Sequence, residues 1–464
     1  MLLGKVFERF ASYSPVSVMM RGILTHALPA ERIDELFRQH AARQYEDELL
    51  FSTCVEILGL AVSGARRSVN AAYRASRAEI EVSVTSLYNK LKGTELAVSQ
   101  ALVRETRERL APLIRQLRAA QAPCLPGYQL RILDGNHLAG TEHRLQETRS
   151  LNSSPLPGQA LVVLDPELML MIDVFPCADA YSQERSMLLA VLETVWAKDV
   201  WVADRNFCTT GFLFGLVRKS AFFVIRQHAS TLSGKRLVGK RTAAGRCAAG
   251  KLYEQTMLLD DPETGEELAV RRITLELDQC TVDGETEIHI LTNLPVEVAG
   301  TKLIAELYRG RWTIENAFQE LDQALASEMN TLCYPQAALL CFCVGVCTYN
   351  VLSAVKAGFR AVHGDAAALH KISGYYLAEE IAAAYHGMLI AIAPKHWTKA
   401  FTHLTTEELV AIVKQLAKNV HLAQFLKNSR GPKKPPPKRS GGLREKHVST
   451  ARLLATRASM TSSK

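Results

Sequence analysis

Two aspartates stand at the ends of predicted strands. The apolar run Tyr128–Leu133 is typical of a strand and ends on Asp134, and Val200–Ala203 ends in the same way on Asp204. In an α/β sheet, polar groups at strand ends meet a crevice in which ligands bind. A single aspartate after a strand is more often part of a turn, so the position alone leaves both roles open.

A third acid comes from a long predicted helix, Thr301–Ser327. Its polar residues at i, i+3, i+7 and i+14 are Tyr308, Arg311, Glu315 and Asp322. At about 100° per residue, these side chains share one face of the helix. An exposed face on which Arg311 pairs with Glu315 explains the pattern as well as a functional face does.

Three carboxylates suit two-metal phosphoryl transfer. Mg²⁺ prefers oxygen ligands, and two ions about 3.5–4 Å apart can hold the attacking and leaving oxygens of a phosphodiester. The candidate catalytic and metal-binding residues are therefore Asp134, Asp204 and Glu315, with two Mg²⁺ ions, or Mn²⁺ in their place, as the expected cofactor. We expect their side chains in one pocket, where Tyr308 and Arg311 would contact phosphates.

The elements that must position these acids form a predicted α/β layer with a mixed sheet, within a catalytic domain spanning residues 128–330. The predicted strands are 128–133, 161–164, 168–174, 200–203, 222–226 and 288–291, and the predicted helices between them are 183–197 and 209–219. The turn at Asp165-Pro166 predicts a hairpin. Residues 228–287 are interpreted as a β-rich insertion, which opens with a stretch rich in Gly, Lys and Arg. Its strand-like runs, Leu252–Leu259 and Leu268–Leu277, are separated by a turn at Asp261–Gly265.

Residues 1–120 are predicted to form a helical N-terminal domain that binds DNA. A short helix should begin at Ser83, as the N-cap, and end before Gly93, as the C′ residue. It follows a basic stretch and would suit a helix-turn-helix in the major groove, with the candidate DNA-binding residues Tyr88, Asn89 and Lys90. A plain helical bundle with a solvated polar face explains the same pattern.

The positive charge of the chain is concentrated at its C-terminus. Residues 331–427 are predicted to be helical and residues 428–464 to be a disordered basic tail. Residues 427–464 carry eleven Lys or Arg and one acid, a net +10, which leaves −2 for residues 1–426 out of the total of +8. A basic segment of this kind favours nucleic acid over membrane, because no lipidation motif accompanies it.

Composition excludes several other classes. The chain is 48% hydrophobic and 22% charged, as in soluble globular proteins, and its 464 residues suggest two or three domains. The ten cysteines lack CxxC pairs, and we expect Cys341, Cys343 and Cys347 to be buried rather than to bind metal. Their apolar run is shorter than a membrane span, and the N-terminus has no apolar signal region. We therefore expect no membrane partner and a reducing, cytoplasmic, nucleoid-associated location.

The motifs around the acids resemble those of a known family, the bacterial insertion-sequence transposases of the DDE superfamily. The resemblance is to the insertion-sequence-four type, with its Tyr-x2-Arg-x3-Glu-x6-Lys signature, and covers residues 128–355 well. The similar motifs are Asp134-Gly-Asn-His, Val202-Ala-Asp204-Arg-Asn-Phe207, Ile290-Leu-Thr-Asn-Leu294 and Tyr308-Arg-Gly-Arg311-Trp-Thr-Ile-Glu315-Asn-Ala-Phe318.

The resemblance implies a ribonuclease H-like catalytic domain and Mg²⁺-dependent cut-and-paste transposition. Its partners would be double-stranded DNA, as terminal inverted repeats and target, and a second copy of the chain in the synaptic complex. It places the catalytic triad on Asp134, Asp204 and Glu315, and DNA contacts on Tyr308, Arg311 and Arg205. Asp322 departs from the pattern, because the family has lysine there.

Two other functions stay open. One is a DNA-binding protein of transposase descent that no longer cuts, which Asp322 favours and the intact triad disfavours. The other is a hydrolytic nuclease of the same fold, which would nick DNA without strand transfer.

Overall fold

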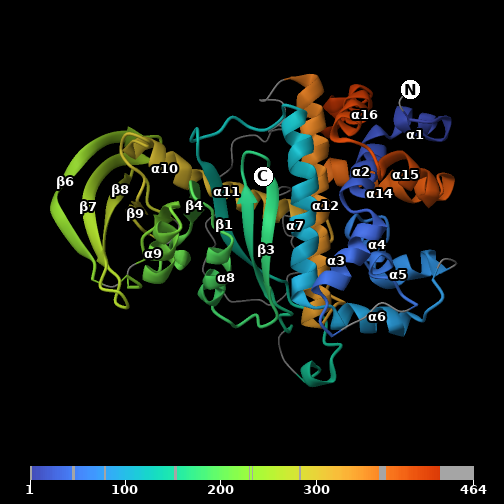
Figure 1. The fold of residues 1–464 in the computed structure, drawn as a ribbon, viewed down its shortest axis with the longest axis horizontal. Helices are drawn as coiled ribbons and strands as arrows, with labels where there is room; N and C mark the ends of the chain where they lie inside the picture. The colour runs from blue at the N-terminus through green and yellow to red at the C-terminus, as the bar shows by residue number, and fades with distance from the viewer. Residues whose placement is uncertain are drawn as a thin grey trace, which may run out of the picture. The chain divides into compact units, whose positions relative to one another are not determined.

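A nine-stranded mixed sheet holds two of the three candidate acids, Asp134 within a strand and Asp204 directly after one (Figure 1). The structure is a computed structural model that describes residues 3–43, 48–77, 80–150, 154–228, 230–232, 234–281, 284–364 and 372–428. The strand order is β3-β2-β1-β4-β5-β9-β8-β7-β6. The strands are β1 (Gln129–His137), β2 (Gln159–Asp165), β3 (Leu170–Cys177), β4 (Asp199–Ala203), β5 (Phe222–Arg226), β6 (Arg236–Cys247), β7 (Gly250–Asp260), β8 (Glu267–Leu277) and β9 (Glu287–Thr292).

Strand direction brings the candidate acids to one edge of the sheet. β1 is parallel to β4, and β4 is parallel to β5. The prediction that the first strand ends at Asp134 is wrong, because pairing with β2 continues β1 to His137. Leu133 pairs with Ala203 in the parallel ladder, so Asp134 and Asp204, the next residue in each segment, are neighbours. The predicted mixed sheet is confirmed, and so is the predicted hairpin, since β2 and β3 pair antiparallel.

The predicted insertion lies between β5 and β9 and extends the sheet as an antiparallel series, β9-β8-β7-β6. The two runs expected to be strands form β7 and β8, and the expected turn between them is present, with Gly265 at φ 74°. Sequence reasoning missed β6, the edge strand. Its residues are nearly all exposed, so it has no alternation of apolar and polar side chains to reveal it.

Helices cover both faces of the sheet. One face packs against α8 (Leu188–Glu193) and α9 (Thr210–Arg218), and the other packs against α10 (Thr301–Gly310) and α11 (Trp312–Ala324). The helix predicted over 183–197 is shorter than expected, because residues Glu184–Met187 form a 3-10 turn, η4, before α8 begins.

The single helix predicted over Thr301–Ser327 is wrong in two respects. It is broken at Arg311, which lies between α10 and α11, and it ends at Ala324. The N–H of Arg311 donates to the carbonyl of Tyr308 at 3.1 Å, the closer spacing of a 3-10 turn. Gly310 precedes the break and weakens the helix there, because glycine is a poor helix former.

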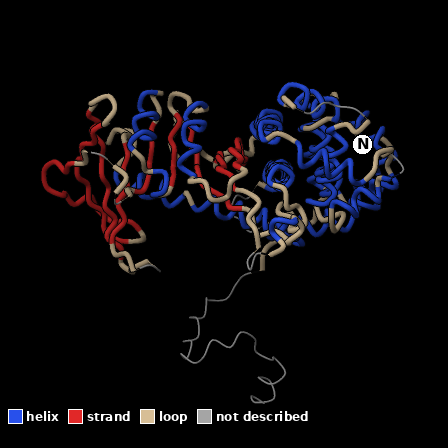
Figure 2. The backbone as a smooth tube through the Cα atoms, turned by 90° about the horizontal axis from the view of Figure 1, so that it is seen from below, coloured by secondary structure: helices blue, strands red, loops and turns tan. Residues whose placement is uncertain are grey.

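The other helices lie beside the sheet (Figure 2), and several of them pack directly against α12 (Pro335–His363). They come from both ends of the chain and are α1 (Glu8–Tyr13), α2 (Pro15–Ala27), α3 (Ala30–His40), α4 (Phe51–Val62), α5 (Val69–Ala75), α6 (Val84–Gly93), α7 (Leu96–Gln116), α14 (Gly374–Ala391), α15 (Pro394–Phe401) and α16 (Thr406–Lys418). Both predicted helical regions are thus observed. The domain boundaries remain a prediction, and the predicted basic tail lies, from residue 429 on, outside the described residues.

By length and composition α12 could cross a membrane, but its most apolar window is entirely buried inside the protein. Its polar residue Asn350 has no solvent exposure and bonds to the edge strand β3. The Asn350 side chain accepts from the N–H of Met171 and donates to the carbonyl of the same residue, both at 2.8 Å. The amide therefore satisfies the backbone N–H and carbonyl of Met171 on the free edge of β3 and links this strand to α12.

Candidate functional site

Asp134 and Glu315 are joined by one guanidinium group. Nη1 of Arg311 lies 2.7 Å from Oδ2 of Asp134, and Nη2 of Arg311 lies 2.7 Å from Oε1 of Glu315. The side chain of Arg311 is 9% exposed. The break between α10 and α11 thus places a buried cation between an acid of the sheet and an acid of the helix.

Asp204 accepts a hydrogen bond from Tyr308, which lies one helical turn before Arg311, in α10. The hydroxyl of Tyr308 donates to Oδ1 of Asp204 at 3.1 Å. Asp204 follows β4 and precedes the 3-10 turn η5 (Arg205–Phe207). The structure therefore brings Asp134, Asp204 and Glu315 together around Tyr308 and Arg311; their catalytic roles stay a prediction.

The electrostatics of Asp134 reflect this crowding. Burial raises the pKa of Asp134 to about 6, and the negative charges of Glu315 and Asp204 act in the same direction. The Arg311 guanidinium and the N–H of Gly135 oppose that rise. Burial also raises the pKa of Tyr308 above its usual range, so its hydroxyl keeps its proton and acts as a donor to Asp204.

Arg226 is a further residue of this site that sequence reasoning missed. Ala203 pairs with Ile225 in the parallel β4–β5 ladder, so Asp204 and Arg226, the next residues, are neighbours. Burial lowers the pKa of the Arg226 guanidinium, but Glu285, Tyr308 and Asp204 together raise it above the usual value. It also donates to both oxygens of Glu285 at 2.5 Å. Arg226 is the last residue of β5, so the strand-end reasoning used for the aspartates could have identified it.

The other predicted site residues have different surroundings. Arg205 is exposed and pairs with Glu285 at 3.2 Å. Asp322 is exposed on α11 and, within the described ranges, has no hydrogen bond or ion pair. The residue at the signature lysine position is therefore not part of the group around Arg311.

The predicted DNA-reading segment forms a short helix, α6, which packs on α12. Ser83 is its N-cap, as expected, and its hydroxyl accepts from the N–H of Ser86 at 3.1 Å. Gly93 is the last residue of the helix rather than the residue after it. On the outer surface Tyr88 is half-buried, Asn89 is exposed and the ammonium of Lys90 lies 4.4 Å from the ring centroid of Phe37. DNA binding by these three side chains stays a prediction.

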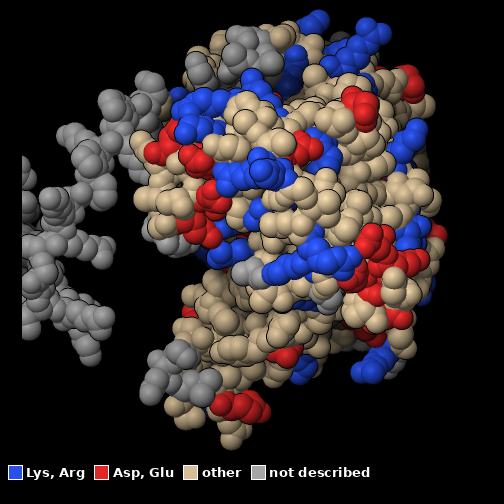
Figure 3. Space-filling view, turned by 90° about the vertical axis from the view of Figure 1, so that its left-hand side faces the viewer, with Lys and Arg blue, Asp and Glu red and all other residues tan. Residues whose placement is uncertain are grey.

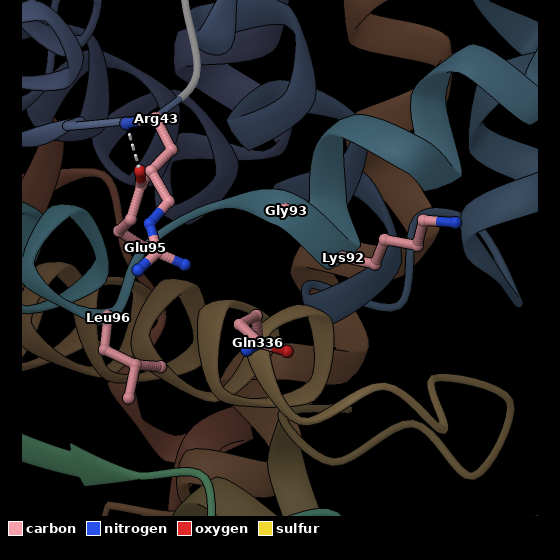
Figure 4. Close-up of a pocket in the computed structure, with 6 residues that line it drawn as sticks. All are labelled: Arg43, Lys92, Gly93, Glu95, Leu96 and Gln336. Atoms are coloured by element: carbon pink, nitrogen blue, oxygen red, sulfur yellow. Dashed lines mark hydrogen bonds between the residues drawn. The ribbon is translucent and has the colours of Figure 1, made fainter.

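A hollow of about 520 Å³ lies at the junction of α6 and α7 (Figure 4). Its lining residues are Arg43, Lys92, Gly93, Glu95, Leu96 and Gln336. The carboxylate of Glu95 accepts from the N–H of Arg43 at 2.7 Å, which fixes the turn there. The residues of the acid cluster are not among those that line it.

The basic stretch that opens the insertion is largely neutralised. Arg236 pairs with Asp260 and Glu267, Arg241 pairs with Glu287, and Arg246 pairs with Asp278. The face of the molecule seen from the insertion side accordingly shows Lys and Arg interspersed with Asp and Glu (Figure 3). Strand β6 therefore does not present a uniformly cationic surface.

The donor set fits a hard divalent cation, because carboxylate oxygens are its preferred ligands. In this conformation Arg311 and Tyr308 hold oxygens of all three acids. Within the part of the chain that the structure describes, no group of three or more His, Cys, Asp or Glu side chains is already arranged to bind a metal ion. Arg311 occupies one oxygen of Asp134 and one of Glu315, and a cation bound to these two oxygens would take its place.

The cysteines of α12 are buried, as expected. Burial raises the pKa of Cys341 and of Cys347 to about 12, and Cys343 is buried beside them. Thiols in such surroundings stay protonated and pack as small hydrophobic side chains.

Comparison with known proteins gives one family match. Residues 126–351 match the family described as Transposase DDE domain, and this segment includes Asp134, Asp204 and Glu315. Comparison with curated proteins gives no match. Among solved structures, the chain is similar to the piggyBac transposase in a synaptic complex with hairpin DNA, with 12% identity, a TM-score of 0.38, and coverage of 95% of this chain and 89% of that chain.

Proposed function

We propose that this chain is a DNA transposase of the DDE superfamily, which excises an insertion sequence and joins it to target DNA by Mg²⁺-dependent phosphoryl transfer. The observation that carries the proposal is the meeting of Asp134, Asp204 and Glu315 around Arg311. These acids lie in the segment that matches the transposase DDE domain.

The sheet supports a ribonuclease H-like catalytic domain. Three strands that pair antiparallel, β1 to β3, are followed by β4 and β5, which run parallel to β1. The acids then come from β1, from the end of β4 and from the helix after the insertion, as the resemblance implies. The spacing of Tyr308, Arg311 and Glu315 supports the insertion-sequence-four type, from which Asp322 departs.

Asp134, Asp204 and Glu315 would hold the Mg²⁺ ions. When bound, Mg²⁺ lowers the pKa of an attacking water and stabilises the charge that develops on the phosphodiester oxygens. The chain supplies the ligand oxygens, and the sheet and α11 keep them on facing elements. Arg311 and Tyr308 supply hydrogen-bond donors next to them.

In this mechanism Arg311 and Tyr308 can donate hydrogen bonds either to the chain's own carboxylates or to a DNA phosphate. In the structure described here they bind the chain's own carboxylates. A DNA phosphate offers the same donors an anionic acceptor, and arginine binds phosphate with two parallel hydrogen bonds. DNA binding would therefore free the acids for metal at the moment when the substrate is in place.

The remaining assignments complete the proposal. Residues 1–120 would bind the terminal inverted repeats, with Asn89 exposed on α6 as a candidate contact. Arg205 and the basic tail would contact phosphates, and two chains would meet in the synaptic complex. We place the protein in the cytoplasm, associated with the nucleoid.

The test uses DNA that carries the terminal repeats of the element. Conversion of supercoiled plasmid to cut forms with Mg²⁺, and its absence without Mg²⁺, distinguishes a nuclease or transposase from a protein that only binds DNA. Products in which a repeat end is joined to new DNA distinguish a transposase from a hydrolytic nuclease. The proposal predicts both products; cutting without joining would contradict it.

A further inference from the structure

The 3-10 turn η4 lies against the segments that carry two of the candidate acids. The β1–β4 ladder ends at the pair Leu133 and Ala203, one residue before Asp134 and Asp204. The backbone pairing therefore makes the two aspartates neighbours, and contacts beyond its last pair fix their separation more closely. Side chains from η4 contact both segments at this position.

The first contact is with Gly135, directly after Asp134. A Cβ atom built on Gly135 would overlap Oε1 of Glu184 and lie 2.6 Å from its Cδ. The carboxylate of Glu184 thus packs on the backbone of Gly135 in the space that any larger residue would occupy. Gly135 is not among the residues with positive φ, so a side chain at this position would disturb the Glu184 carboxylate and not the backbone conformation.

The second contact is with Asn206, two residues after Asp204. The side-chain amide of Asn206 donates to Oε2 of Glu184. The next residue of η4, Arg185, donates from Nε to the backbone carbonyl of Asn206 at 2.9 Å and to its Oδ1 at 3.2 Å. The side chain of Glu184 is 17% exposed, and Nδ1 of His137 lies 3.8 Å from its Oε1.

We propose that Glu184 is a positioning residue, which holds Asp134 and Asp204 at a fixed separation beyond the end of the β1–β4 ladder by bridging Gly135 and Asn206. The inference rests on the proposed function, because the aspartates need a fixed separation only if they share metal ions. A site for two ions tolerates only small errors in ligand position, and residues that orient the ligands typically change metal affinity or activity by about 10–100-fold when replaced.

The charge of Glu184 is not what this role requires. The two contacts that carry this role are the steric contact with Gly135 and the hydrogen bond accepted from Asn206, while the His137 ring lies farther away, at 3.8 Å. A glutamine in its place keeps the length of the side chain and one oxygen that can accept from the Asn206 amide. A residue that itself bound metal would instead need the carboxylate, because an amide is a poorer ligand for a hard cation.

The test compares Glu184→Ala, Glu184→Gln, Asn206→Ala and the double variant Glu184→Ala/Asn206→Ala. The readouts are Mn²⁺ affinity of the full-length protein without DNA, cleavage of terminal-repeat DNA, and the thermal unfolding midpoint. We expect Glu184→Ala and Asn206→Ala each to lower Mn²⁺ affinity and cleavage by about 10-fold or more. The double variant should lose no more than the worse single variant, since both remove one interaction. Glu184→Gln should stay within about threefold of wild type in both readouts.

Gly135 provides an independent variant. Gly135→Ala alone should displace Glu184 and lose cleavage, whereas Gly135→Ala/Glu184→Ala should be no worse than Glu184→Ala, because the clash has been removed. Glu193→Ala, on the exposed end of α8, is the control that should match wild type.

Three outcomes overturn the inference. If Glu184→Gln loses as much Mn²⁺ affinity and cleavage as Glu184→Ala does, while Asn206→Ala stays near the wild-type values, Glu184 is a metal ligand instead. A lower unfolding midpoint with unchanged Mn²⁺ affinity would make its role purely structural. If the wild-type protein is active and Glu184→Ala has the same Mn²⁺ affinity and cleavage rate, Glu184 has no positioning role. A wild-type chain without Mn²⁺ affinity or cleavage would instead overturn the proposed function and this inference with it.

Discussion

Arg311 donates to Asp134 at 2.7 Å, although the two residues are 177 positions apart in the sequence. The same guanidinium holds Glu315. Several carboxylates in one partly buried place repel one another unless a cation lies between them. Arg311 supplies such a cation from the chain itself and joins Asp134 to Glu315.

Replacing Arg311 tests this competition. We expect Arg311→Gln to raise Mn²⁺ affinity of the DNA-free protein at pH 8 by roughly 10-fold, because a buried positive charge no longer competes for the acids. Affinity for DNA should fall in the same variant. Titration of Mn²⁺ followed by electron paramagnetic resonance measures the first effect. Arg309→Gln, at an exposed position of α10, is the matched control and should change neither property beyond a surface charge effect. Weaker Mn²⁺ binding in Arg311→Gln would show that Arg311 organises the site rather than competing in it.

Metal affinity should depend on pH through Asp134. Its pKa is raised to about 6, mainly by burial, and a proton must leave before the carboxylate can bind metal. Mn²⁺ affinity without DNA should therefore rise about tenfold per pH unit below 6 and level off above it. Arg311→Gln should move the midpoint to higher pH, because Arg311 lowers the pKa of Asp134.

The unfolding free energy should also change as Asp134 titrates, but it should fall with rising pH where Mn²⁺ affinity rises. The folded-state pKa of Asp134 lies above its ordinary value of 3.8, so the folded chain binds this proton more tightly. The contribution of Asp134 to the unfolding free energy is present below pH 3.8 and is lost as the pH rises through about 6. A midpoint of Mn²⁺ binding at or below about pH 4, near the ordinary pKa of an aspartate, would contradict both expectations.

Sequence patterns that span only a few neighbouring residues predicted much of this fold. Apolar runs bounded by turn residues identified most of the strands, and Ser83 identified the start of α6. Strand β6 was missed because nearly all its residues are exposed. Helical periodicity also could not show the interruption at Arg311, because this residue keeps helical dihedrals and only the hydrogen bonding changes to that of a 3-10 turn.

The sequence predicted those residues of the candidate site that stand at the ends of predicted strands. Asp134 and Asp204 stand where the sequence predicts strand ends, although β1 continues to His137. Arg226, the last residue of β5, could have been found in the same way. Glu184 could not, because its contacts with Gly135 and Asn206 depend on how η4 packs against the sheet. A single contact between segments that are far apart in the sequence leaves no repeating pattern of residue types by which it could be predicted.

The basic tail should add affinity without adding specificity. Deleting residues 431–464 should flatten the dependence of log K on log salt, by about 0.9 for each phosphate of duplex DNA that the tail neutralises. Preference for terminal-repeat DNA over random DNA should stay unchanged. Binding isotherms at several salt concentrations measure both. Loss of that preference on deletion would assign the tail a sequence-reading role.

Asn350 should be important for stability. Asn350→Ala leaves the N–H and the carbonyl of Met171 without their partner in a buried place, which should lower the unfolding free energy by about 2–5 kcal/mol. Urea denaturation measures the change. Asn419→Ala, which removes one bond at an exposed position, is the matched control and should cost about 1 kcal/mol or less.

The most direct test of the central claim compares two acids of α11 by cleavage of terminal-repeat DNA in Mg²⁺. Glu315→Gln keeps the shape of the side chain and its bond with Arg311 but removes the charge, so it should lose cleavage by orders of magnitude and still bind DNA. Asp322→Asn, at an exposed position outside the Arg311 cluster, should cut at close to the wild-type rate. An inactive Asp322→Asn beside an active Glu315→Gln would contradict the account, because the metal-binding acid of this helix would then be Asp322.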